Sequence, residues 1–186
     1  MNLKLITPPA IDPVTLPEMR TYARGAADGP DLDNTVSMLI KSARETAQNF
    51  QNRAYFTQTW EASFDFFPAM PLKIPRPPLQ SVESIKYVDE NGTEIAMNLA
   101  DFIIDTDSEP GRIAFKRGKC WPSVVLQDIN GLKIRFVAGH NDINKVPNAV
   151  KLAYMVYVTH RLENPEVNAP PDAFYNLLWP ERLVPV

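Results

Sequence analysis

The chain has 186 residues, and its 19 basic and 22 acidic side chains give a net charge of −3, without a strongly basic half that would support broad nucleic-acid binding. Hydrophobic content of 45% is typical of a soluble globular protein, and the single Cys120 excludes a disulfide framework and a thiolate zinc site. No apolar run reaches the ~18 residues of a membrane span and no secretory signal opens the chain, so we expect a soluble protein made in the cytoplasm.

The first elements are an extended arm over residues 2–13 and a short helix over 16–24. Thr15 and Glu18 have the spacing of a capping box, and Pro17 fits the first turn of a helix. Gly25 is a natural helix stop.

A long helix is predicted over residues 31–55, with Asp31 or Asp33 as its cap. Its apolar residues recur every three or four positions and form one stripe. They are Leu32, Val36, Leu39, Ala43, Ala47, Phe50 and Ala54. The polar residues Lys41, Arg44, Glu45, Gln48, Gln51 and Asn52 are expected on the wet side.

After Tyr55 the hydrophobic period changes from helical to alternating, which indicates β-strands. In residues 57–66 one face carries Trp60, Phe64 and Phe66. Asn91-Gly92 is a hairpin signal, because both residues tolerate positive φ. Further short strands are predicted at 72–74, 82–88, 93–97, 102–104, 112–115 and 132–137.

A second core helix is predicted over 147–163, apolar on most of its faces. A last helical turn or two is predicted over 172–178. The sequence therefore predicts an α+β fold in one domain spanning 1–186. A small helical core, 14–56 and 146–164, carries a β-rich antiparallel insertion, 57–139, and a C-terminal tail, 165–186.

No catalytic constellation stands out. Asp101, Asp105, Asp107 and Glu109 crowd into nine residues, and such carboxylates can hold a divalent cation. The pattern does not match a calcium loop, and acids on the wet side of a strand and turn are the commoner case.

The other chemical candidates are equally isolated. Cys120, His140 and His160 lack a flanking catalytic motif, and the seven glycines form no phosphate loop. We therefore predict no enzyme activity, no cofactor and no metal. A basic loop with Lys116, Arg117 and Lys119 could contact a phosphate backbone or an acidic partner, although short charge runs usually face water.

Several segments together resemble one protein family. They are LKLITPPAIDPVTLPEMRTYAR, QTWEASFDFFP, IPRPPLQSVESIKYVDENG, DTDSEPGRI and RFVAGH, in this order along residues 3–140, with a proline-started helix after them. The chain from 3 to 163 is similar to the head–tail connectors, or head-completion adaptors, of tailed bacteriophages and prophages.

The resemblance implies a structural protein without catalytic residues, located in the virion neck. Members of this family form a ring under the portal, extend the DNA channel and join head to tail. The implied partners are other copies of the chain, the portal protein, a tail-side connector or tail protein, and passing genomic DNA bound without sequence specificity.

The tail is the candidate docking segment, because it is more apolar than a free end requires. The candidate residues are Phe174, Leu177, Leu178 and Trp179. The alternative is that this tail covers its own core. Two other functions stay open: a DNA-packaging accessory with weak DNA contact, and a metal-dependent hydrolase using the acids at 101–109.

Overall fold

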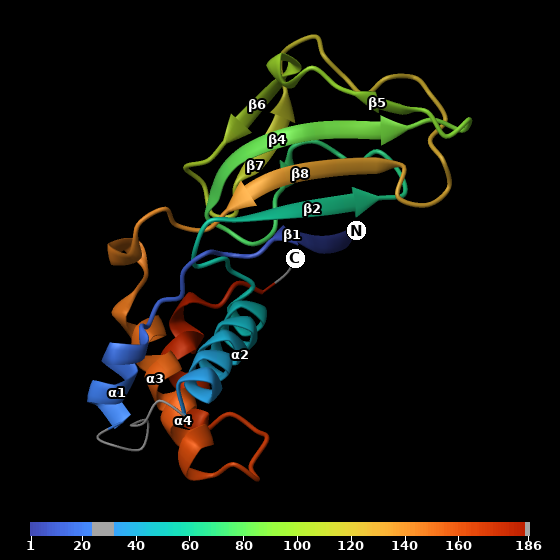
Figure 1. Cartoon of the computed structure of the whole chain (residues 1–186). Helices are drawn as coiled ribbons and strands as arrows, with labels where there is room; N and C mark the ends of the chain where they lie inside the picture. Colours follow the sequence, from blue (N-terminus) through green and yellow to red (C-terminus); the bar gives the residue numbers. More distant parts are fainter. Residues whose placement is uncertain (24–31, 185–186) are drawn as a thin grey trace. The chain divides into compact units, whose positions relative to one another are not determined.

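The computed structural model describes residues 1–23 and 32–184 and has the expected α+β composition (Figure 1). It divides into two compact units. A β unit comprises Met1–Ala10 and Thr57–His140, and a helical unit comprises Ile11–Phe56 and Asn141–Val186. Most of the extended arm predicted over residues 2–13 thus belongs to the β unit.

The β unit contains two antiparallel sheets. The larger has the order β1-β2-β8-β4-β5, and the smaller has the order β3-β7-β6. The strands are β1 (Asn2–Thr7), β2 (Gln58–Phe64), β3 (Leu72–Lys73), β4 (Leu79–Val88), β5 (Glu94–Ala96), β6 (Phe102–Asp105), β7 (Arg112–Phe115) and β8 (Leu132–Ala138).

Alternating burial gives the larger sheet one apolar face. In β2 the side chains of Trp60, Ala62 and Phe64 are buried, and they lie beside the buried Phe136, Ile134 and Leu132 of β8. The prediction for Phe66 is wrong: this side chain is exposed. Strand β2 ends at Phe64, and the next residue, Asp65, turns to accept the Asn130 N–H at 2.9 Å.

The predicted hairpin joins β4 to β5. Gly92 has a φ of 82°, a conformation that glycine adopts without steric cost. The Asp89 carboxylate accepts the N–H groups of Asn91 and Thr93 and closes the turn.

The helical unit contains α1 (Leu16–Ala23), α2 (Asp33–Gln51), α3 (Asn148–Glu163) and α4 (Asp172–Leu178). The capping box of α1 is confirmed, with the Thr15 N–H and hydroxyl donating to Glu18 Oε2 at 2.7 and 2.8 Å. Arg24, Gly25 and Asp31 lie outside the described residues. Asp33 opens α2 and forms an ion pair with Arg20, and no side chain caps this helix.

Helix α2 buries Val36, Ile40, Ala43 and Ala47 in a core shared with α3. The assignment of Arg44, Gln48 and Gln51 to its wet side is wrong, since all three are buried. Arg44 pairs with Asp12 at 2.6 Å, and the Gln51 amide donates to the Leu178 carbonyl at 2.5 Å. The polar stripe of α2 is therefore covered by segments distant in the sequence.

Candidate functional site

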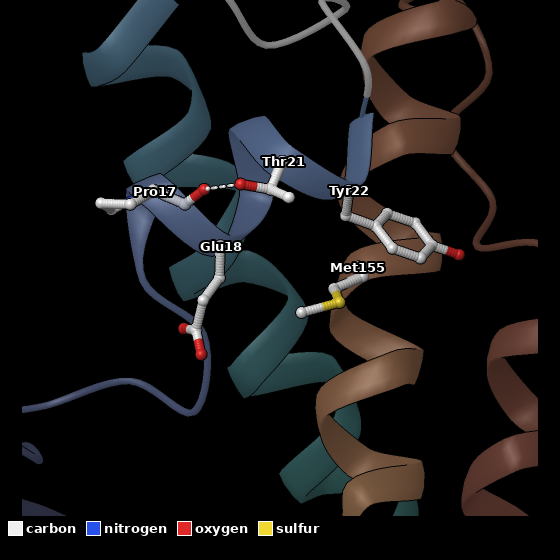
Figure 2. A pocket seen from close by; sticks show the side chains of 5 residues that line it. All are labelled: Pro17, Glu18, Thr21, Tyr22 and Met155. Carbon is white, nitrogen blue, oxygen red and sulfur yellow. Dashed lines mark hydrogen bonds between the residues drawn. The ribbon is translucent and has the colours of Figure 1, made fainter.

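Among the described residues, a hollow lies in the helical unit between α1 and α3 (Figure 2). Its volume is about 830 Å³. The lining residues are Pro17, Glu18, Thr21, Tyr22 and Met155.

Two polar side chains of this hollow, Glu18 and Thr21, already have partners. Glu18 completes the capping box, and hydrogen bonds from the backbone and then the side chain of Thr15 hold the pKa of its carboxyl below the usual value. The Thr21 hydroxyl donates to the Pro17 carbonyl at 2.9 Å. The hollow therefore presents an open surface with apolar contacts and no nucleophile–base pair.

The acidic cluster is used to build a turn between β6 and β7. Asp105 Oδ2 accepts from the Ser108 hydroxyl at 2.7 Å and from Arg112 Nη2 at 2.6 Å. Hydrogen bonds from Ser108 and then Arg112 lower the pKa of Asp105 well below its usual value. Asp101 forms an ion pair with Lys119 at 2.8 Å.

Because Asp101 and Asp105 are bonded to protein groups, few of their carboxylate oxygens are free to bind a cation. Within residues 1–23 and 32–184 no three His, Cys, Asp or Glu side chains are grouped so as to hold a metal ion. Gly111 of the same turn is packed closely, because a Cβ there would lie 2.5 Å from the Leu79 Cβ. The DTDSEPGRI motif is therefore explained by turn geometry.

The basic loop follows β7 and is exposed. Lys116, Arg117 and Lys119 all face solvent, and Lys119 is paired with Asp101. Cys120 is an exposed free thiol on the same loop. His140 ends the β unit and His160 belongs to α3 of the helical unit.

The candidate docking tail divides into buried and exposed residues. Phe174 and Leu178 are both 0% exposed and belong to the helical core, and Leu177 packs partly against it. Trp179, by contrast, is 61% exposed. Of the four predicted docking residues, Trp179 alone exposes most of its side chain to solvent.

Trp179 is held in place by the end of the chain. The Arg182 guanidinium lies 4.7 Å from the Phe50 ring centroid and 5.3 Å from that of Trp179. Arg182 Nε also donates to the Phe50 carbonyl at 3.1 Å. This cluster was missed from the sequence, because the only available signal was an isolated Arg182 after Trp179.

No described helix has the length and apolar character that crossing a membrane requires. No protein-family model and no curated protein matches this chain.

Solved structures share the fold over the whole chain. A chain in the neck of an empty gene transfer agent particle, computed with C6 symmetry, has a TM-score of 0.80 at 19% identity. A chain in the virion of the native particle has a TM-score of 0.78 at 18% identity, and one in the native neck, computed with C12 symmetry, has 0.75 at 18%. Each alignment covers 100% of this chain and 97% of the other. The chain therefore has the fold of a chain found in the neck of gene transfer agent particles.

Proposed function

We propose that this protein is a structural head–tail connector that forms a ring in the neck of a phage-like particle. The full-length fold match to neck chains carries the proposal. The C6 and C12 symmetries of two of those structures support a ring, because a heterologous contact that repeats around an axis closes on itself.

The ring would join the portal protein on one side to a tail-side connector or tail protein on the other. The absence of a built catalytic site in the described residues fits a purely structural task. DNA would pass through the ring without sequence-specific contact. The exposed Lys116 and Arg117 are available for phosphate contacts.

Trp179 is the proposed contact with a neighbouring particle protein. Large aromatic side chains that remain mostly exposed are typical of protein interfaces, and Trp is enriched among their energetic centres. Its cation–π contact with Arg182 holds the indole of Trp179 in a defined orientation before a partner binds.

The test is assembly. We would image the purified protein by negative-stain electron microscopy, both alone and mixed with portal-bearing heads that lack it. The images are scored for rings and for completed heads. Trp179→Ala should fold normally and fail to complete heads. Met38→Ala is the matched control, because Met38 is also an exposed apolar residue of the helical unit, at 68%.

Absence of rings in both preparations would contradict the connector proposal. If Trp179→Ala completes heads at the parental level, Trp179 is not an interface contact, and the ring proposal still stands.

A further inference from the structure

The larger sheet of the β unit has two open edges. β1 forms one edge and β5 the other (Figure 1). In the part of the chain that the structure describes, no strand pairs with the outer side of either. Edge strands leave alternate N–H and C=O groups without a ladder partner and are ready templates for another strand.

Both edges expose apolar side chains on the same face of the sheet. Leu5 stands opposite Trp60 in the register, and Ile95 stands opposite Tyr87. Trp60 and Tyr87 are both buried, whereas Leu5 is 40% and Ile95 37% exposed. The apolar face thus continues to each edge and is left uncovered there.

The two edges also differ in charge in a complementary way. Lys4 is the only charged side chain of β1. The hairpin at 89–94 carries Asp89, Glu90 and Glu94 and no basic residue. Glu94, which binds Lys86 and Lys133, still has 41% of its side chain exposed. Opposite charges at the two edges attract each other at a distance and steer the encounter of two copies.

The strand directions allow the two edges to meet. Every neighbouring pair in the sheet is antiparallel, so β1 and β5, separated by three strands, run in the same direction. Asn2 and Ala96 lie at the same level of the sheet, because one row of paired residues joins them. That row runs Asn2, Ser63, Lys133, Lys86, Ala96.

We propose that β1 of one copy pairs in parallel with β5 of the next copy, so that the larger sheets join edge to edge around the ring. In this register Asn2 lies beside Ala96 of the neighbour on one face of the sheet, and Leu3 lies diagonally across from Ile95 on the apolar face. The edges differ from each other, so the contact is heterologous and repeats. The inference rests on the proposed ring and names the surface that forms it.

Disulfide trapping tests the pairing in the full chain. In a Cys120→Ser background, cysteine replaces Asn2 or Lys4 together with Glu94 or Ala96, giving four pairs whose members share one face. A disulfide needs Cα atoms within about 7 Å, so it reports direct strand neighbours. The control pair, Leu3→Cys with Ala96→Cys, puts the two thiols on opposite faces.

The rings, either of the purified protein or on portal-bearing heads, are mildly oxidised and analysed on a non-reducing gel. We expect at least one same-face pair to give a covalent ladder of multimers that disappears on reduction, with the control remaining monomeric. Visible rings without a ladder from any of the four pairs would overturn the edge pairing and leave the connector function intact. A ladder of equal yield from the control pair would overturn it as well. Failure to form rings at all would overturn the connector proposal itself, and the pairing with it.

Discussion

The side-chain amide of Gln51 donates to the main-chain carbonyl of Leu178 at 2.5 Å, joining the end of α2 to the end of α4 inside the helical core. Gln51 Oε1 in turn accepts from the Tyr55 hydroxyl at 2.5 Å. The Gln51 carbonyl accepts the Leu183 N–H at 3.0 Å. The C-terminal segment is therefore attached to α2 by main-chain as well as side-chain groups.

Phe174→Ala should destabilise the protein by about 3–5 kcal/mol, because it removes a fully buried ring and leaves a cavity. Urea unfolding followed by circular dichroism measures the change. Trp179→Ala, five residues later and mostly exposed, is the control and should cost about 1 kcal/mol or less, the size of its cation–π contact. Equal effects of the two changes would mean that α4 does not pack on the core.

Ala43→Asp should cost several kcal/mol, since Ala43 is 0% exposed and a carboxylate there would be buried without a partner. Met38→Asp on the same helix is the control, because Met38 is exposed and its replacement should change stability by about 0.5 kcal/mol or less. Thermal melting of the two variants beside the parent gives the comparison. A parental melting temperature for Ala43→Asp would contradict the burial of the α2 stripe.

Local patterns in the sequence predicted most of the secondary structure. Helix α4 and strand β7 have the predicted bounds, because a proline or a turn residue flanks each of them. The capping box at Thr15 and the hairpin at Gly92 were predictable for the same reason: both depend on residues close together in the chain.

The errors have a common cause in partners distant along the chain. Arg44 is polar, and nothing near it in the sequence shows that Asp12 will pair with it. Gln51 is buried because α4 returns over the end of α2, 127 residues later. The tail itself was ambiguous from sequence, since the same apolar residues suit a core and a docking surface. In the structure Phe174 is buried in the core and Trp179 is exposed at the surface.

The capping box gives a pH-dependent prediction. Hydrogen bonds from Thr15 lower the pKa of Glu18 in the folded protein. The ionised Glu18 therefore contributes stability at pH values above its ordinary pKa of 4.5. This contribution is lost as the pH falls through the pKa of Glu18 in the folded state. Thr15→Ala removes the side-chain hydrogen bond and should flatten this part of the acid dependence. Urea midpoints measured at intervals from pH 7 to pH 3 test it. The control is Thr46→Ala. The Thr46 hydroxyl donates to the Ser42 carbonyl and has no carboxylate partner. This variant should lower stability without changing the acid slope.

The last prediction concerns the ion pair between Arg44 and Asp12, whose side chains are only 10% and 21% exposed. Asp12→Ala leaves the Arg44 guanidinium enclosed without its carboxylate and should destabilise the protein by about 3–5 kcal/mol. Lys119→Ala breaks an exposed pair with Asp101 and serves as the control, with an expected cost of about 0–1 kcal/mol.

The double variant Asp12→Ala with Arg44→Met separates the pair's own contribution from the penalty of the orphaned charge. It should recover part of the loss seen in Asp12→Ala, because the methionine stem still fills the space beside the core while no buried charge remains. Equilibrium unfolding of the two single variants and the double variant completes the cycle. Additive losses would show that the two side chains do not interact, and that Arg44 is stabilised by other groups.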